Sequence, residues 1–225
     1  MARARRASPR ARGLVAIDVA CLVAFTLAMG WSLARIEAVP PLLFWPGMLV
    51  AGLIGVAAAD LGTGLVHWAG DSFGEEETPI IGPVLIVGFR EHHRDPLRIV
   101  AHGFVEVSGA NALAATPIAL GIAALGPEVS TSLWAATGLA FLLAAAVTAV
   151  LSNQLHRWAH MARRPRVVRW MQRHRLILSR EHHARHHRGA HDRAFCVANG
   201  WMNPLLDWLI ERRRRASNHG PWART

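Results

Sequence analysis

Four long apolar stretches constrain the fold of this chain more than any other feature of its sequence. The stretches cover residues 14–33, 42–59, 110–125 and 133–151. A helix of about 17–25 apolar residues can cross a bilayer, so the first, second and fourth stretches are long enough. The third is short, and extending it back to Val105 brings it near the limit but includes Glu106. We therefore expect an all-α integral membrane protein with about four transmembrane helices.

The connections between the apolar stretches predict two hairpins. Residues 35–41 join the first two stretches and residues 126–132 join the last two, and each connection is short and contains proline. The remaining segments, 1–13, 60–104 and 152–225, hold nearly all of the arginines, and loops rich in arginine favour the cytoplasmic side. All thirteen histidines lie in these segments. The sequence therefore predicts a His-rich helical cap on the cytoplasmic face.

The basic composition bears on partners and compartment. The net charge is +10, and all 25 basic residues are arginine. The absence of lysine is typical of a high-GC bacterial genome, so we expect a multi-pass protein of a bacterial inner membrane. Long apolar runs argue against a soluble nucleic-acid-binding protein, and we expect no nucleic-acid partner. The run Arg212–Arg215 is better explained by attraction to anionic lipid.

Charge and hydropathy also predict the domain limits. Residues 1–13 carry five arginines and are expected to form a disordered basic tail. A single membrane domain is expected at 14–210, followed by a basic C-terminal tail at 211–225. A cleaved signal peptide ending near 32–34 is an alternative for the first apolar stretch. Cleavage would leave the histidine-bearing segments on the same side of the membrane.

The cysteines and histidines together indicate what kind of metal site the chain can build. Cys21 lies in an apolar stretch and Cys196 in the basic C-terminal part, so a disulfide between them is not expected. Two single cysteines do not make a Cys-based zinc site. Histidine is the commonest protein ligand for transition metals. Any metal is therefore expected to be held by imidazole, with oxygen ligands as further candidates.

Two groups of histidines have helical spacing. His156 and His160 follow the fourth apolar stretch at i and i+4, so they share one helix face. A basic helix end at the membrane surface is the alternative interpretation of this pair. The segment 181–187 reads E-H-H-A-R-H-H. In a helix His182 would share a face with His186, and His183 with His187, with the two faces about 100° apart. One short helix could thus serve two metals or cap one, although a His-rich tract can also bind metal adventitiously.

His67 follows the second apolar stretch, and Asp71 lies four residues further on the same helix face. Asp71 could bind a metal or orient a histidine from behind, and the second role is favoured because imidazole ligands are already plentiful. Asp60, at the end of the apolar stretch, is explained equally well as an interfacial charge.

Further candidates come from the segment 79–95 and the polar residues near the membrane edge. The stretch is apolar, too short to span and rich in Gly and Pro, so it is expected to be an interfacial or re-entrant piece that brings His92 and His93 to the metal. Polar groups at a membrane edge are functional candidates by default. This criterion retains Glu106 and Asn111, and His102 and Asn153 are further candidates.

These motifs, in this order, resemble the plasmanylethanolamine desaturase family, which includes a plant chloroplast branch. The resemblance runs from about Asp60 to Asn203, over D-L-G-T-G-L-V-H-W-A-G-D, F-R-E-H-H-R-D-P, S-N-Q-L-H-R-W-A-H, R-E-H-H-A-R-H-H and F-C-V-A-N-G-W-M-N. It implies an iron-dependent membrane desaturase whose histidines correspond to His67, His92, His93, His102, His156, His160, His182, His183, His186, His187 and His191. His191 is kept as a supporting candidate. His174 is displaced by one position from the family pattern, so His174 and His219 are expected to be bystanders.

The resemblance implies a reaction that converts a 1-O-alkyl ether phospholipid to its 1-alkenyl vinyl ether. Removing hydrogen from an unactivated C–H bond requires a metal and O2, since side chains cannot do it. We expect two irons, no catalytic residue beyond the metal ligands, and an external electron donor such as a ferredoxin or a b-type cytochrome with its reductase. An acyl-chain desaturase or hydroxylase is one alternative. A non-catalytic metal-binding protein is another, but a transporter should carry its ligands inside the spans.

Overall fold

A computed structural model describes residues 12–34, 41–79, 81–82, 86–124 and 132–218. The described residues form helices and no strands, which confirms the expected all-α class. The long helices are α1 (Arg12–Ala34), α2 (Pro41–Ser72), α5 (Phe104–Ala124) and α6 (Leu133–His160). The short ones are α3 (Val87–Arg94), α4 (Arg98–Ala101), α7 (Arg166–Arg173), α8 (Arg180–His183) and α9 (Asn203–Asn218). The four long helices are apolar and long enough to cross a membrane, so the chain is a multi-pass membrane protein.

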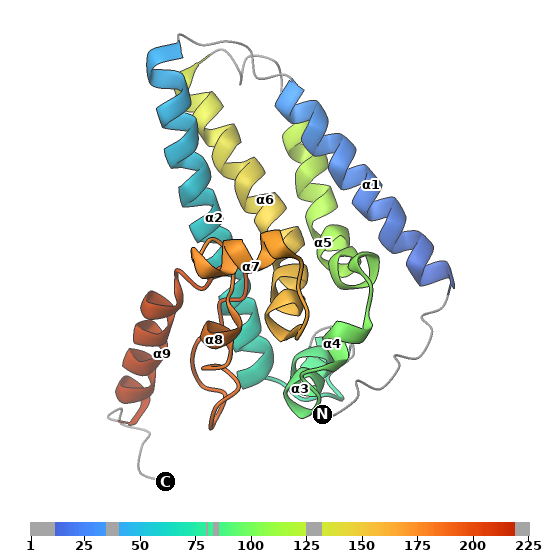
Figure 1. The fold of residues 1–225 in the computed structure, drawn as a ribbon, viewed down its shortest axis with the longest axis vertical. Helices are drawn as coiled ribbons and strands as arrows, with labels where there is room; N and C mark the ends of the chain where they lie inside the picture. The colour runs from blue at the N-terminus through green and yellow to red at the C-terminus, as the bar shows by residue number, and fades with distance from the viewer. Residues whose placement is uncertain (1–11, 35–40, 80, 83–85, 125–131, 219–225) are drawn as a thin grey trace.

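The long helices form a row rather than a closed bundle. In Figure 1 the order across the row is α2, α6, α5 and α1, and the main contacts join α2 to α6, α6 to α5, and α5 to α1. The hairpin of α5 and α6 thus packs on itself. Helices α1 and α2 run antiparallel at opposite ends of the row, and each packs against a helix from the other hairpin.

Glycines allow close approach at both ends of the row. A Cβ added at Gly55 of α2 would lie 2.3 Å from the backbone oxygen of Phe141 in α6. One added at Gly109 of α5 would lie 2.3 Å from the side chain of Asp18 in α1. Small residues favour helix packing in membranes because they let backbones approach closely. The apolar core between α1 and α5 includes Phe25.

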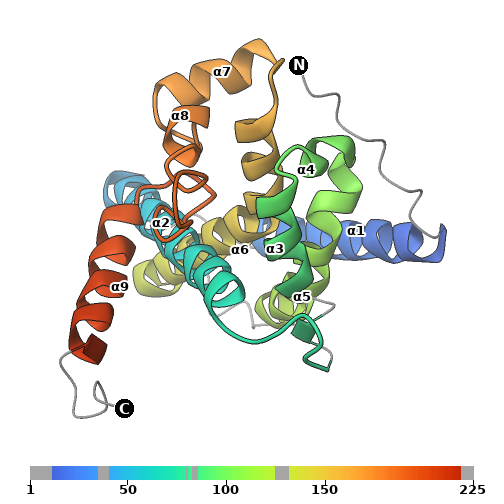
Figure 2. The same ribbon diagram turned by 90° about the horizontal axis from the view of Figure 1, so that it is seen from below.

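Two of the long helices continue past the apolar stretches that predicted them. Helix α2 runs to Ser72, about 20 Å beyond Ala59, and α6 runs to His160, about 13 Å beyond Leu151. The short helices and the segment after α6 gather around these two extensions, beyond the apolar stretches of the long helices (Figure 2). This arrangement produces the expected His-rich cap, and it carries ligands on rigid helices that are also anchored in the row.

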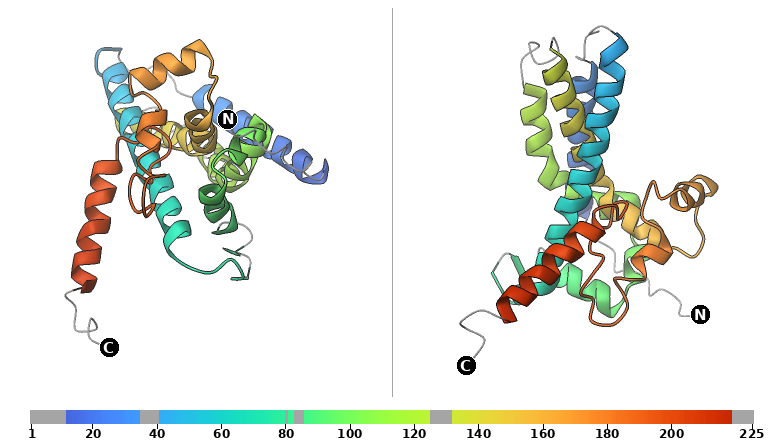
Figure 3. Two further views of the ribbon diagram at one scale, coloured as in Figure 1. Left: turned by 60° about the horizontal axis from the view of Figure 1, so that its bottom comes forward. Right: turned by 90° about the vertical axis from the view of Figure 1, so that its left-hand side faces the viewer.

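The cap has its own apolar core over the extension of α2. Phe195, Cys196, Leu206 and Ile210 are buried together and pack against Leu61, Trp68 and Met202. Cys196 is a free thiol, as is Cys21, in line with the expectation of no disulfide. Figure 3 shows how α9 leaves this core at an angle to the row.

Both predicted tails differ from the structure at their boundaries. Helix α1 already begins at Arg12, and residues 1–11 lie outside the described part. The predicted tail 211–225 begins as a helix, because α9 continues to Asn218. Leu206 and Ile210 are buried one turn apart and fix the start of this helix. The following glutamate and arginines are good helix formers, so nothing in the sequence ends α9 at residue 210.

The predicted interfacial or re-entrant segment 79–95 contains α3, which contacts α2 and lies at the cap end of the molecule (Figure 1). Ile80 and residues 83–85 lie outside the described residues. The described part delivers His92 and His93 into the cap, as expected.

Candidate metal centre

Two groups of ligand atoms converge inside the cap, and within each group they lie within 4.8 Å of one another. The five-histidine group consists of His92, His156, His160, His183 and His187. The Asp71 group consists of His67, Asp71, His93 and His186. The side chains come from α2, α3, α6, α8 and the turn after α8, so both groups depend on segments that are distant in the sequence.

The five-histidine group is centred on His183, which is buried. Its Nε2 atom lies 2.8 Å from Nε2 of His156, 2.8 Å from that of His160 and 2.9 Å from that of His187. Nε2 of His92 lies 3.1 Å from Nε2 of His187. The predicted pairing of His156 with His160 along one helix face is present, with 3.2 Å between the two Nε2 atoms.

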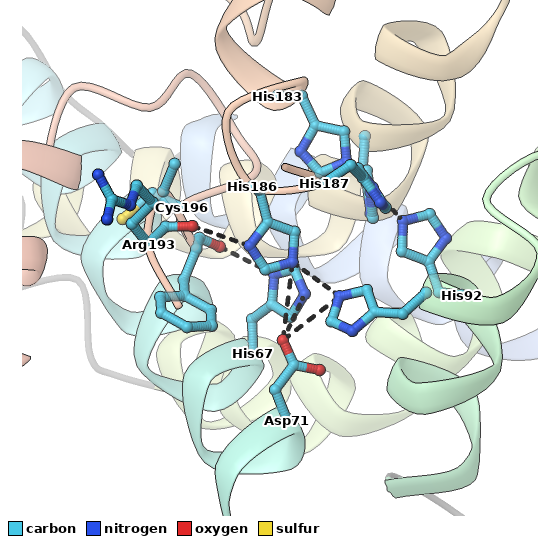
Figure 4. Close-up of polar contacts among 12 residues, drawn as sticks. His67, Asp71, His92, His183, His186, His187, Arg193 and Cys196 are labelled. Atoms are coloured by element: carbon cyan, nitrogen blue, oxygen red, sulfur yellow. Dashed lines mark hydrogen bonds and ion pairs between the residues drawn. The ribbon is translucent and has the colours of Figure 1, made fainter. Parts of the chain in front are cut away.

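The Asp71 group is centred on a carboxylate (Figure 4). Oδ2 of Asp71 lies 3.3 Å from Nε2 of His67, 3.6 Å from that of His93 and 3.7 Å from that of His186. Nε2 atoms of His93 and His186 lie 2.8 Å apart. The carboxylate therefore faces the same point as the imidazole nitrogens instead of lying behind one of the rings.

The histidine doublets are divided between the two groups. His92 belongs to the five-histidine group and His93 to the Asp71 group; likewise His187 belongs to the first and His186 to the second. The ring centroids are 6.0 Å apart in the first doublet and 5.3 Å apart in the second. Neighbouring residues on a helix point about 100° apart, so a doublet on α3 can face two centres at once. The two groups are consequently adjacent and share the elements that carry them.

The last histidine box does not form the single helix predicted for it. Helix α8 ends at His183, and the chain continues in tight turns in which the amide of His186 donates to the carbonyl of His183. His183 and His187 still meet, but His182 and His186 do not share a site. The ring of His182 lies outside both groups, with Nε2 3.2 Å from Nδ2 of Asn203. The pairing predicted for His182 and His186 was therefore wrong.

Backbone carbonyls orient two histidines of the Asp71 group. Nδ1 of His67 lies 2.9 Å from the carbonyl oxygen of Phe195, and Nδ1 of His186 lies 2.9 Å from that of Arg193. If each Nδ1 carries the hydrogen, it donates to the carbonyl and the lone pair of Nε2 faces the site. Metal-binding histidines commonly make such a hydrogen bond with their other ring nitrogen. Ala194 separates the two carbonyls and has a left-handed backbone with φ 58. Its amide donates to Oδ1 of Asp207 at 2.8 Å.

Asp60 holds the segment that supplies these carbonyls. The carboxylate is fully buried, and it accepts hydrogen bonds from the backbone amides of four residues at 3.0–3.1 Å. The donors are Ala198, Asn199, Gly200 and Met202. Asp60 is thus an internal anchor of the cap rather than an exposed interfacial charge.

Sequence reasoning missed the supporting role of 193–202, although the segment was visible as F-C-V-A-N-G-W-M-N. One local signal was Gly200, which has φ 78 and leaves room for the ring of His182, since a Cβ there would lie 2.7 Å from Cε1 of that ring. The signal does not reveal that the segment binds Asp60 more than a hundred residues earlier.

His102, Glu106 and His191 lie outside the two groups. Nδ1 of His102 lies 3.5 Å from Oε2 of Glu106, and the same oxygen accepts the amide of Gly103 at the start of α5. These two residues therefore interact with each other at a helix end. The ring of His191 stacks on that of His93, with centroids 4.3 Å apart, and thus supports a member of the Asp71 group.

Asn111 and Asn153 form a small polar network between α5 and α6. Nδ2 of Asn111 donates to the carbonyl of Ala149 at 3.0 Å and to Oγ of Ser152 at 3.1 Å. Nδ2 of Asn153 donates to Oδ1 of Asn111 at 3.2 Å. Asn153 precedes His156 by nearly one helical turn, so this network lies on the membrane side of the five-histidine group. His174 is exposed, and His219 lies outside the described residues.

The electrostatics of the cap suit metal binding. Burial, and then the neighbouring His191, lowers the pKa of His93 and of His187 to about 4 in each case. Burial lowers the pKa of His183 well below its ordinary value, with His160 as the next cause. These rings are therefore neutral at neutral pH, which is the form that binds metals.

Three buried atoms of the Asp71 group lack a hydrogen-bond partner. Nε2 of His67 and both carboxylate oxygens of Asp71 are buried without a hydrogen-bond partner, and such groups are costly to leave unsatisfied. Imidazole nitrogens bind a zinc ion at about 2.0–2.1 Å. Two nitrogens bound to one ion with a nitrogen–metal–nitrogen angle of about 90° would therefore lie about 3 Å apart. The observed Nε2 separations of 2.8–3.2 Å in the five-histidine group fit this spacing. Both groups are suited to a first-row transition metal.

Comparison with known proteins agrees with this chemistry. The lipid desaturase domain matches residues 56–211. The chain is 38% identical over 191 residues to plasmanylethanolamine desaturase of Myxococcus xanthus, covering 85% of this chain and 66% of that protein. It is 35% identical over 199 residues to plasmanylethanolamine desaturase 1 of Mus musculus, covering 86% and 70%.

A plant relative extends the comparison. Fatty acid desaturase 4, chloroplastic, of Arabidopsis thaliana is 34% identical over 162 residues, covering 70% of this chain and 47% of that protein. No solved structure matches the chain. The domain match includes every residue of the two ligand groups, and on this evidence the chain belongs to the lipid desaturase domain family.

Proposed function

We propose that the chain is a di-iron, O2-dependent membrane desaturase that converts a 1-O-alkyl ether phospholipid to its 1-alkenyl vinyl ether. The observation that carries the proposal is the pair of adjacent ligand groups, which are linked by the two divided doublets. The choice of lipid follows the names of the Myxococcus xanthus and mouse relatives, both plasmanylethanolamine desaturases.

One iron would be held by the five-histidine group and the other by the Asp71 group. Asp71 is assigned as a ligand rather than as a support because its oxygens face the Nε2 atoms and are otherwise unsatisfied. His182 and His102 are assigned supporting roles, since neither belongs to a group. His191 is assigned to the support of His93.

Two bound irons with O2 would supply the oxidising power to remove hydrogens from an unactivated C–H bond. The protein's own part is to position and protect. The carbonyls of Phe195 and Arg193 fix the rings of His67 and His186. Phe89 stacks on His67 with centroids 4.9 Å apart and covers one side of that ring. Burial keeps the histidines neutral and excludes water from the reacting end of the substrate.

The electrons would come from an external acidic carrier, a ferredoxin or a b-type cytochrome with its reductase. Arginines crowd the cap surface around α7 and α9, and a positive surface favours encounter with an acidic partner. The excess of arginine in the cap also supports a cytoplasmic orientation. We place the protein in a bacterial inner membrane, for which the absence of lysine is the sequence argument.

An acyl-chain desaturase is the second candidate. It is favoured by the similarity to fatty acid desaturase 4 of Arabidopsis thaliana. A transporter is disfavoured because the ligands carried by α2 and α6 lie in the last turns of these helices and not midway along them.

Lipid analysis tests the proposal directly. The chain is expressed in a host that lacks vinyl ether lipids and is fed a 1-O-alkyl phosphatidylethanolamine. We expect vinyl ether with the wild-type chain and none with His183→Ala. His174→Ala, which removes an exposed histidine outside both groups, serves as the matched control and is expected to behave as wild type.

Metal analysis separates the cofactor from the substrate. A fully loaded sample should contain about two irons per chain. A well-folded, iron-loaded protein that makes no vinyl ether but oxidises an acyl chain would replace the ether lipid by the second candidate. A loaded sample with one iron or none would contradict the di-iron assignment.

A further inference from the structure

A groove of about 470 Å³ runs along α6 on the membrane side of the two ligand groups. Its walls come mainly from α2 and α5, which flank α6 in the row, and its floor is a face of α6. The volume lies within the range of about 300–1,000 Å³ that is usual for small-ligand sites. Its lining is almost entirely apolar and rich in alanine, so it fits a hydrocarbon chain better than a polar molecule.

The floor of the groove leads straight to a predicted ligand. Leu142, Ala145, Ala149 and Asn153 line the groove at intervals of three or four residues, and the next position on this helix face is His156. Ala149 lies about 10 Å along the helix from His156, and Leu142 about 21 Å. One helix thus carries both the groove floor and the five-histidine group, so depth along the groove measures distance from the metal site.

The end of the groove near the cap is also its polar end. Asn111, Ser152 and Asn153 line the groove there, whereas the far end is lined by Ile118, Ile122 and Leu142. Asn153 uses one amide hydrogen in its contact with Asn111. Its carbonyl oxygen and its second amide hydrogen remain available to an oxygen or hydroxyl group near the head of a lipid.

The groove is accessible from the bilayer along its side. Val66 and Ile118, on the two walls, are 49% and 61% exposed, whereas Ala115 on the inner surface is 9% exposed. Ile118 lies in the apolar stretch of α5, a helix long enough to span a membrane, so the opening on this side faces lipid, whereas Val66 lies next to His67 at the cap end of the groove. A membrane lipid can therefore enter a chain sideways without leaving the bilayer.

We propose that one hydrocarbon chain of the lipid substrate lies in this groove along α6, with its head-linked end at Asn153 and its methyl end toward Leu142. This inference rests on the proposed function and deepens it. The lining of the groove on α6 runs from Asn153 away from His156 to Leu142, so a chain in this register presents to the metals the carbons next to the lipid head. Asn153 is a positioning residue that sets how far the chain descends toward His156.

Photolabelling tests the register of the chain without requiring turnover. The full-length, iron-loaded protein in phosphatidylcholine nanodiscs is exposed to 1-O-alkyl phosphatidylethanolamine that carries a diazirine either near the ether oxygen or near the methyl end. The first probe should label α6 around Asn153 and the second should label it around Leu142. An excess of the unlabelled ether lipid should suppress both signals.

Two outcomes would overturn the register. A reversed order of labels would mean that the chain enters with its methyl end toward the metals. Labels confined to the outer face of α6 around Val147, which does not line the groove, would mean that only bystander lipid was captured. If labelling follows the expected order but no vinyl ether is formed, the proposed reaction fails while the chain site stands.

A series of phenylalanine substitutions tests the groove by activity. Ala149→Phe fills the groove close to His156 and should lower turnover most, Ala145→Phe should lower it less, and Leu142→Phe least. Val147 lies between Ala145 and Ala149 in depth, but on the exposed face of α6. Val147→Phe should therefore leave turnover and iron content unchanged. Equal losses at Ala149 and Val147, or the largest loss at Leu142, would refute the register.

Asn153→Leu tests the positioning role at similar volume. Loss of one hydrogen bond to the substrate should raise KM about fivefold, and it should spread the labelling by the head-end probe over neighbouring turns. Iron content should stay at the wild-type level. Wild-type labelling and KM in this variant would remove Asn153 from the proposal.

Discussion

The two ligand groups share their doublets but are held in place by different means. In the five-histidine group, described contacts of the ring nitrogens are with other histidines, and the rings are carried by α3, α6, α8 and the turn after α8. In the Asp71 group, His67 and His186 are oriented by backbone carbonyls of the segment 193–195. That segment leads into the loop that Asp60 binds.

The difference teaches that the ring orientations in the five-histidine group depend on helices and the turn after α8, whereas those in the Asp71 group also depend on a tethered loop. The long helix α6 fixes His156 and His160 through its anchoring in the row. His67 lies on α2, which is longer still, but the orientation of its ring depends on the position of Phe195. Loosening the loop should therefore weaken iron binding by the Asp71 group and leave iron binding by the five-histidine group unchanged.

Removing one ligand from each group should produce the largest effects and tests whether the sites are separable. Loss of a supporting contact costs about 10–100-fold in metal affinity or activity, so loss of a direct ligand should cost more than about 100-fold. His156→Ala and His67→Ala should each abolish desaturation. Elemental analysis should find about one iron per chain in each variant under the two-site arrangement. Full loss of both irons in either variant would show that the groups bind metal only together.

Asp60→Asn should distinguish the tethered group from the helical one. The variant replaces a charged acceptor of four buried amides by a neutral one, and hydrogen bonds to charged groups contribute about 1.5–3 kcal/mol each. We expect weaker iron binding at the Asp71 group by about 10–100-fold. Titration with a chelator should remove one iron from this variant well before the second. Simultaneous release of both irons would contradict the proposed independence of the helical group.

Asp207→Asn should have a smaller effect of the same kind. Asp207 accepts the amide of Ala194, the residue between the two orienting carbonyls. Replacing this charged acceptor by a neutral one should cost about 1 kcal/mol of stability. A lower thermal unfolding midpoint of the detergent-solubilised protein, with both irons retained at saturating metal, is the expected result. Loss of the first iron as easily as in Asp60→Asn would assign Asp207 a larger share of the tether.

Arg214→Ala should have the smallest effect. Arg214 pairs with Asp192 at 2.9 Å on the surface of α9, and exposed ion pairs contribute about 0–1 kcal/mol. Iron content and the chelator titration should match wild type, with a slight fall in the unfolding midpoint at low salt. A selective loss of iron from the Asp71 group would show that the tether extends beyond the loop to α9.

Local spacing predicted much of the candidate centre because helices obey it. His156 with His160 and His67 with Asp71 meet as expected, since both pairs lie on long continuous helices. The spacing failed at His182 because α8 ends after four residues, so helical periodicity no longer applied. Asp71 was expected behind the ligands, and only the geometry showed its oxygens facing the Nε2 atoms.

In the fold, too, some features were predicted from the sequence and others were seen only in the structure. Hydropathy predicted the four long helices, but α2 and α6 continue well past the apolar stretches because polar residues can extend a helix that the cap covers. The short connection 35–41 predicted that α1 and α2 would form a hairpin. Close approach at Gly55 and Gly109 instead places α2 against α6 and α1 against α5.

The sequence by itself determined that the chain is helical, spans a membrane and gathers its described histidines at one end, because length, hydropathy and charge act through the local chain. Only the tertiary structure decided how these histidines are divided into two groups, that Asp60 anchors a loop, and where the groove lies. Each of these features joins residues far apart in the sequence. Their positions depend on how the helices pack, which no local pattern specifies.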